Sequence, residues 1–260
     1  QLYKEIEASD VKYVCDIGFD LGSSLKAVEH AKALPWCYAV VGVHPHDAKT
    51  LDEDVLLMIK SLAKKDKVQA IGEIGLDYHY NLSEPDVQRY WFRRQIQLAN
   101  ELKMPIVIHS READQECMDI LKEEGAFSDE RCSWFTKRKG PNGQMVKDAR
   151  VLLHCFSGSR EMAEQYVKLG ATISIAGPVT YKNNKKTPEV VKAIPIEFLL
   201  VETDAPYLTP EPFRGKKNKS PLVEYTARHV AALKKMEYED VDYWPELCRI
   251  MEWSKTNVHS

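Results

Sequence analysis

Residues 105–111 have the sequence PIVIHSR, a short apolar run that ends in polar side chains, and this pattern predicts a β-strand. Side chains alternate across a β-strand, so Val107 and His109 share one face. Ile106 and Ile108 share the other face, and we expect them to pack outward against helices. The polar residue stands at the carboxyl end of the strand, where (β/α) barrels carry their catalytic groups.

The same kind of segment recurs along the chain. Six further runs are strand candidates: VKYVCDIGF (11–19), CYAVVGVHP (37–45), QAIGEIGLD (69–77), VLLHCFS (151–157), ATISIAG (171–177) and FLLVETDAP (198–206). Hydrophobic residues at three- and four-residue spacing predict helices at 22–34, 53–64, 85–103, 112–124 and 160–169, and two more near 221–236 and 244–257. This alternation predicts an α/β protein with a parallel sheet, a TIM-type (β/α) barrel.

The length of 260 residues suits one barrel of about 250 residues, so we expect a single domain over residues 1–260. A closed barrel needs eight strands, whereas the sequence offers seven. Residues 1–9 have the character of a helix end, so we expect the first strand to precede Gln1. Residues 128–150 form an insertion longer than the usual loop before a strand.

The insertion contains the basic run Lys137, Arg138 and Lys139. Such a run is compatible with a nucleic-acid patch. A loop that leads into a strand lies at the amino-terminal face of the barrel, away from the catalytic face. We therefore favour a solvated surface without a direct function for this run.

Composition narrows the function classes. Apolar residues make up 44% and charged residues 29%, and no apolar run approaches the ~20 residues of a membrane span, so we expect no membrane partner. The net charge of −3 argues against a basic scaffold that coats nucleic acid, but not against an enzyme that grips a few phosphates. The six cysteines lack CxxC pairing, which favours an intracellular, cytoplasmic location, with the nucleus or an organelle as alternatives. An oligomeric state does not follow from the sequence.

Four polar side chains occupy matched positions at the carboxyl ends of four strand candidates. They are Glu73, His109, His154 and Asp204. Each one taken alone is compatible with a hydrogen-bonded core histidine or a salt-bridged carboxylate. Imidazole and carboxylate together suit Zn, Mn or Fe, and a carboxylate can bridge two ions. Without a cation the carboxylates would repel each other and lose solvation, so the four predict a metal site.

Neighbouring residues supply candidate supporting and substrate-binding groups. Glu202 shares a strand face with Asp204, which suits a residue that orients a ligand histidine, although a buried salt bridge is an alternative. His44 stands at a strand end and is our candidate to donate a hydrogen bond to an anionic substrate; His46 is less favoured. Arg111 is positioned to clamp a phosphate, or to form an ion pair at a helix start.

Basic loops follow two of the strands on the catalytic face. Residues 182–186 contain three lysines, and residues 214–219 contain Arg214 and Lys216. Both loops could track a phosphodiester backbone, although solvated lysines are the default for each. Three aromatic residues lie beside carboxylates at the same rim, where rings can stack on bases: Tyr78, Tyr80 and Tyr207.

The motifs that carry these residues resemble those of the TatD family of metal-dependent DNases, within the amidohydrolase-like superfamily. They occur in the family's order and spacing: VGVHPHDA (41–48), AIGEIGLDY (70–78), PIVIHSREAD (105–114), LHCFSGS (153–159), ISIAGPVTYKN (173–183) and VETDAPYLTP (201–210). RGKKNKSP (214–221) is similar to the family's RGKRNEP loop, with Lys219 where an acidic residue is usual.

The resemblance implies a role for each matching residue. Glu73 would bridge two metal ions, and His109 and His154 would bind one of them. Asp204 would be a ligand and a proton acceptor. The resemblance also implies that His44 and Arg111 contact the substrate. The family opens with an HxH motif on its first strand, which this sequence lacks, in line with the strand expected before Gln1.

These observations predict a hydrolase that cleaves phosphodiester bonds of DNA in an exonuclease-like manner, at a single strand or strand end. Two divalent ions (Mg, Mn or Zn) would lower the pKa of bound water towards ~7. Asp204, with Glu202 as a second catalytic candidate, would take up the proton. Two alternatives remain open: an amide, lactone or ester hydrolase of the same superfamily, and a metal-poor homologue without activity. Glu73 argues against the branch of the superfamily that carries a carbamylated lysine.

Overall fold

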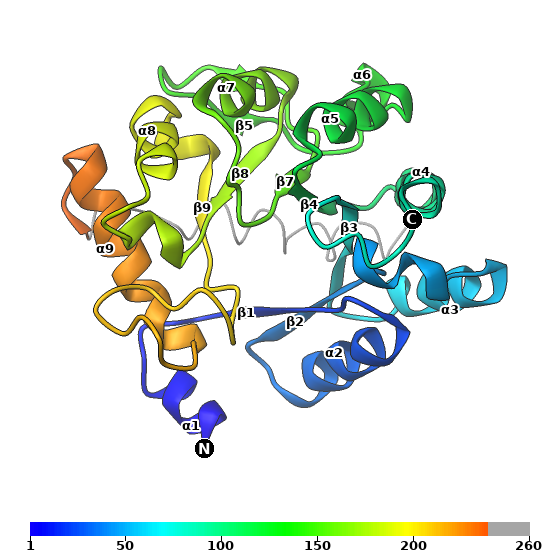
Figure 1. The fold of residues 1–260 in the computed structure, drawn as a ribbon, viewed down its shortest axis with the longest axis horizontal. Helices are drawn as coiled ribbons and strands as arrows, with labels where there is room; N and C mark the ends of the chain where they lie inside the picture. Colours follow the sequence, from blue (N-terminus) through cyan, green and yellow to red (C-terminus); the bar gives the residue numbers. More distant parts are fainter. Residues whose placement is uncertain (239–260) are drawn as a thin grey trace.

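The computed structural model of the chain describes residues 1–238. Its centre is a curled, seven-stranded parallel sheet of order β1-β2-β3-β4-β7-β8-β9 (Figure 1). The strands are β1 (Val14–Ile17), β2 (Cys37–Val41), β3 (Val68–Asp77), β4 (Ile106–Arg111), β7 (Val151–Leu153), β8 (Thr172–Ile175) and β9 (Leu199–Val201). Each of the seven predicted segments matches one strand, with β3 beginning one residue earlier than predicted, and the α/β, TIM-like arrangement is confirmed.

Helices surround the sheet on its outer side (Figure 1). They are α1 (Leu2–Glu7), α2 (Leu21–Ala33), α3 (Glu53–Ala63), α4 (Pro85–Glu101), α5 (Asp114–Glu123), α6 (Asp129–Ser133), α7 (Arg160–Leu169), α8 (Lys186–Ala193) and α9 (Val223–Lys234). The sequence did not predict α8, since only Val190 and Val191 supply a short apolar stripe in a polar segment. The helix predicted at 244–257 lies outside the described residues. None of the described helices combines the length and apolar composition that a membrane crossing requires.

Side-chain caps and a glycine fix several helix ends. The Asp20 carboxylate accepts a hydrogen bond from the Ser23 N–H at 2.6 Å and begins α2. Ser159 caps α7 in the same manner, and α7 ends at Gly170 in the left-handed conformation. Caps of this kind satisfy backbone groups that have no partner inside the helix. These local signals explain why the predicted boundaries of α2 and α7 agree with the structure within one residue.

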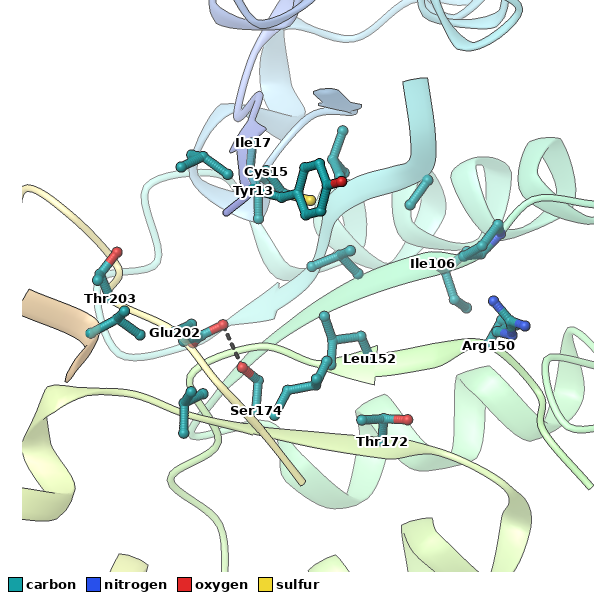
Figure 2. Close-up of a pocket in the computed structure, with 18 of the residues that line it drawn as sticks. Tyr13, Cys15, Ile17, Ile106, Arg150, Leu152, Thr172, Ser174, Glu202 and Thr203 are labelled. Atoms are coloured by element: carbon teal, nitrogen blue, oxygen red, sulfur yellow. Dashed lines mark hydrogen bonds between the residues drawn. The ribbon is translucent and has the colours of Figure 1, made fainter. Parts of the chain in front are cut away.

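The two faces of the sheet carry separate apolar clusters. Ile106 and Ile108 belong to the large cluster that includes the helix residues Phe92 and Cys117, as strand parity predicted. The inner cluster consists of Val40, Ala70 and Val107, with Ile17 and Leu152 packed against it. A cavity of about 210 Å³ adjoins this inner cluster. Figure 2 shows Arg150 and Glu202 at opposite ends of the cavity, which therefore extends along the interior towards the carboxyl ends of the strands.

The insertion at 128–150 folds against the amino-terminal ends of the strands. It contains α6 and an antiparallel hairpin of β5 (Arg138–Lys139) and β6 (Met145–Val146). Arg138 is buried and donates hydrogen bonds to Asp148 and to the carbonyl oxygens of Gly170 and Ala171. The solvated surface expected for the basic run is therefore wrong for Arg138, because Asp148 and the two carbonyl oxygens compensate the burial of its guanidinium.

Gly75 on β3 provides a test of the close approach between β3 and β4. It lies opposite His109, and a Cβ at this position would stand 1.9 Å from the His109 carbonyl oxygen. Gly75→Ala should lower the free energy of unfolding by about 1–3 kcal/mol or more, because two backbones would have to separate. Chemical denaturation measures this change.

Gly22→Ala in α2 is the matched control. A Cβ there would meet only the Asp20 side chain, at 3.7 Å. Alanine is the better helix former, so this variant should keep its stability or gain up to about 1 kcal/mol. Equal stability of the two variants would contradict the packing argument.

Candidate metal centre

Glu73 on β3 lies close to side chains from β4 and from the residue that follows β7. Its Oε1 atom lies 3.0 Å from Nδ1 of His109 and 3.7 Å from Nε2 of His154. Nε2 of His154 in turn lies 3.4 Å from Oδ1 of Asp204. The structure thus gathers into one cluster the four side chains that we predicted as metal ligands from strand parity. Their roles as ligands stay a prediction.

The register between β3 and β4 explains how Glu73 reaches His109. Ile71 pairs with Ile106, but the register shifts by one residue before Ile74 pairs with Ile108. Gly75 consequently stands opposite His109. Side chains two residues apart share a strand face, so Glu73, Gly75 and Asp77 all point the same way. Since Gly75 is opposite His109, Glu73 and Asp77 lie on either side of the His109 ring.

His44 joins the cluster from the end of β2. Ligand atoms of His44, Glu73 and His109 all lie within 4.8 Å of one another, a spacing that suits a metal ion. The His44 and His109 rings meet edge to face with their centroids 4.3 Å apart. We predicted His44 as a substrate contact. Its position also makes it a candidate ligand, which the sequence reasoning missed.

Glu202 lies behind His154, on the side away from Glu73. Its Oε2 atom is 2.8 Å from Nδ1 of His154 and accepts a hydrogen bond from the Ser174 hydroxyl at 2.6 Å (Figure 2). Its Oε1 atom accepts the backbone N–H of Cys155 at 2.6 Å. Both carboxylate oxygens are therefore occupied. This arrangement suits a group that fixes the orientation of His154 and leaves Nε2 facing Glu73.

Asp77 occupies the equivalent place behind His109, and the sequence analysis gave it no role. Its Oδ2 atom lies 2.9 Å from Nε2 of His109 and 3.0 Å from Nε2 of His46. Its Oδ1 atom accepts the backbone N–H groups of His79 and Tyr80. The signal that could have revealed Asp77 was its parity with Glu73 on the same strand.

The charges of the cluster depend on one another. Burial opposes ionisation of Glu73, but His154 and His109 outweigh it and hold the pKa of this carboxyl well below its usual range. Burial likewise opposes protonation of His154, yet Glu202 and Glu73 raise its pKa well above the ordinary value. The carboxylates thus stabilise positive charge at this point, as a site for a divalent cation must.

The donor set also fits a metal ion in its chemistry. Burial, followed by the neighbouring His109, lowers the pKa of His44 to about 3, and a neutral imidazole is the form that binds metal. Imidazole nitrogens and carboxylate oxygens are common ligands of Zn and Mn, while carboxylates are the ligands that Mg prefers. The described residues therefore offer a chemically suitable site for a divalent ion.

The rim beside this cluster carries an arginine and an exposed aromatic ring. The Arg111 guanidinium lies 4.7 Å from the centroid of the Tyr80 ring. The same ring meets His46 edge to face at 5.5 Å, and Tyr80 is 56% exposed. Tyr78 differs, because its hydroxyl donates to Glu116 at 2.7 Å and its side chain packs against the apolar core. Tyr80 is therefore the better placed of the two rings to meet a substrate.

The second basic loop also presents a cation over an aromatic ring. The Arg214 guanidinium lies 4.1 Å from the centroid of the Tyr181 ring, which connects the loop after β9 with the loop after β8. Lys216 lies 5.5 Å from the Phe213 ring. Lys219 pairs with Glu5 at 2.6 Å, so part of the predicted basic patch is neutralised locally.

Comparison with known proteins identifies the relatives of this chain. The sequence profile of the TatD related DNase family matches residues 1–244. The chain belongs to this family. A short match to homoserine O-succinyltransferase covers only residues 230–260, most of which lie outside the described part. The family assignment confirms the resemblance seen in the motifs and makes the protein a metal-dependent hydrolase of the TatD family.

Two curated relatives illustrate the similarity. The chain is 42% identical over 241 residues to the uncharacterized metal-dependent hydrolase YabD of Bacillus subtilis, covering 93% of this chain and 87% of the relative. It is 36% identical over 200 residues to the 3′-5′ ssDNA/RNA exonuclease TatD of Klebsiella pneumoniae, covering 76% and 68%. Among solved structures, the TatD homologue YjjV of Escherichia coli superposes with a TM-score of 0.78 at 23% identity, covering 96% and 92%, and supports the fold.

The contact between Glu202 and His154 in this TatD-family protein can be tested by titration. In the presence of chelator, Glu202→Gln should lower the pKa of His154, because Glu202 is the main group that raises it. The stabilisation from protonated His154 is fully present below pH ~6.5 and is lost as the pH rises through the raised pKa. The stability gap between wild type and variant should therefore narrow at high pH.

NMR titration of the imidazole resonances gives the pKa, and denaturation at several pH values gives the stability gap. Glu164→Gln is the control, because Glu164 is on α7 and pairs with Arg160 on the same helix. An unchanged His154 pKa in Glu202→Gln would refute the arrangement.

Proposed function

We propose that the protein is a deoxyribonuclease that hydrolyses phosphodiester bonds at a metal centre formed by Glu73, His109, His154 and Asp204. The observation that carries this proposal is the shared cluster of these side chains, in which Glu73 contacts both histidines. In this proposal the chain forms one barrel domain, and residues 128–150 are an insertion on the face away from the metal centre.

Two divalent ions, of Mg, Mn or Zn, are the proposed cofactors. A single oxygen of Glu73 faces Nδ1 of His109 and Nε2 of His154, so these three side chains would hold the ions together. His44 would be a further ligand, since its ligand atom lies within 4.8 Å of those of Glu73 and His109. When bound, the ions supply Lewis acidity that polarises the phosphoryl group and lowers the pKa of water.

Asp204 is the proposed proton acceptor. Its side chain is 31% exposed, compared with 14% for Glu73, so it is the carboxylate of the cluster most open to solvent and substrate. It follows β9, and its Oδ1 atom lies 3.4 Å from Nε2 of His154. A water molecule that attacks phosphorus must lose a proton, and a carboxylate beside it can accept that proton. Glu202, with both oxygens engaged, would hold His154 in place.

The proposed substrate is single-stranded DNA or a free strand end. Arg111 and Arg214 would contact phosphates, and Tyr80 and Tyr181 beside them would stack on bases. Lys216 would add charge along the backbone path. The name of the Klebsiella pneumoniae relative, an exonuclease for single-stranded DNA and RNA, supports this class of substrate.

Asp204→Asn tests the catalytic assignment. The substitution keeps the shape of the side chain but removes the proton acceptor, so cleavage of a single-stranded oligonucleotide with Mg²⁺ or Mn²⁺ should fall about 100- to 10,000-fold. The thermal unfolding midpoint should stay near that of the wild type, because the side chain is partly exposed.

Asp129→Asn is the matched control, because Asp129 is a 98% exposed carboxylate on α6 of the insertion and pairs with Lys147. It should retain wild-type cleavage. Wild-type turnover by Asp204→Asn would remove the proposed role of this residue.

Metal content and substrate choice separate the proposal from its alternatives. We expect about two divalent ions per chain by elemental analysis, and complete loss of nuclease activity with a chelator. Glu73→Gln should lower the metal content, since Glu73 faces both histidines. Hydrolysis of lactones or esters without nuclease activity would favour the other hydrolases of the superfamily, and a chain that binds no metal would favour an inactive homologue.

A further inference from the structure

We propose that Asp77 is a positioning residue of the metal centre, which holds the Nε2–H group of His109 so that the Nδ1 lone pair faces Glu73. The inference rests on the metal site proposed above and adds a residue to which no role in that site has been given. It concerns the orientation and tautomer of one ligand, and it does not require Asp77 to touch metal or substrate.

The contacts of His109 leave little choice of orientation. Nδ1 lies 3.0 Å from Oε1 of Glu73, and Nε2 lies 2.9 Å from Oδ2 of Asp77. The edge-to-face contact with His44 restricts the ring on a further side. A neutral imidazole carries one proton, so a carboxylate that accepts it at Nε2 leaves Nδ1 free as a ligand.

Asp77 is itself rigidly held. Its side chain is 1% exposed. Its Oδ1 atom accepts the backbone N–H groups of His79 at 3.1 Å and Tyr80 at 3.0 Å. The backbone N–H of Asp77 donates to Gln88 of α4 at 2.9 Å. A carboxylate fixed by these contacts can fix its partner, whereas a mobile surface carboxylate could not.

The arrangement repeats what Glu202 does for His154. Glu202 meets Nδ1 of His154 and leaves Nε2 facing Glu73, while Asp77 meets Nε2 of His109 and leaves Nδ1 facing Glu73. Each candidate ligand histidine is therefore held between Glu73 and one outer carboxylate. Outer carboxylates of this kind set the tautomer and raise the basicity of ligand histidines.

Asp77→Asn is the direct test. The amide oxygen can still accept the two backbone N–H groups, so the local turn has a means to persist. Its NH₂ group would then face His109 and favour a proton on Nδ1, the nitrogen needed for metal. Isothermal titration of the full chain with Mn²⁺ should give a Kd about 10- to 100-fold weaker than for wild type.

Asp148→Asn is the matched control, because Asp148 is equally buried but lies before β7 at the other end of the barrel, beside Arg138 and Arg150. It should lower stability without changing the Mn²⁺ affinity. Equal weakening by both variants would mean that Asp77 has only a structural role and would overturn the inference, as would an unchanged Kd in Asp77→Asn.

NMR of the ¹⁵N-labelled wild-type chain with Mg²⁺ tests the same point without a substitution. The His109 ring should carry its proton on Nε2, and a ring protonated on Nδ1 would overturn the inference even if Asp77→Asn fails to fold. Glu73→Gln separates the two proposals. Unchanged Mn²⁺ affinity in Glu73→Gln would refute the metal site itself, whereas weakened affinity there with normal affinity in Asp77→Asn would refute only the role of Asp77.

Discussion

The interior placement of Glu73 is the constraint on which the site depends. A buried carboxylate loses its hydration and needs positive charge or hydrogen-bond donors close by. His109 and His154 supply them from two neighbouring strands, and each histidine is held on its far side by another carboxylate. Imidazole and carboxylate groups alternate across the mouth of the barrel: His46, Asp77, His109, Glu73, His154 and Glu202.

This alternation has a consequence for function. Carboxylates that favour protonated histidines will also favour a divalent ion, because both supply positive charge at the same place. The outer members of the row, Asp77 and Glu202, are tied to backbone N–H groups and thus to the strand ends themselves. The ligand geometry is therefore set by the strand ends and by the first residues of the loops that follow them. The residues proposed to meet the substrate are Arg111 at the end of β4 with Tyr80 in the turn that follows β3, and Arg214 with Tyr181 in the loops after β9 and β8.

Family membership and geometry support the function at different levels. The TatD related DNase profile and the curated relatives make the chain a metal-dependent hydrolase. The similarity to YjjV at 23% identity concerns the fold alone. The proposal of a DNA strand as substrate rests on the basic and aromatic residues beside the cluster and on the chemistry of the proposed centre. The insertion at 128–150 adds nothing to the proposed substrate contacts, since Arg138 within it is buried in structural hydrogen bonds.

From the sequence alone we could predict the seven strands of the parallel sheet, six of the helices and the convergence of Glu73, His109, His154 and Asp204. It could do so because side chains alternate along a strand and because parallel strands end at one edge of a sheet. Only the tertiary structure decided that Asp77 holds His109, that His44 approaches the same cluster and that the Tyr78 hydroxyl turns to Glu116. These contacts depend on the one-residue register shift between β3 and β4 and on the packing of helices against strands. The periodicity of a single segment encodes neither the register shift nor the helix packing, because each arises between two segments that are separated in the chain.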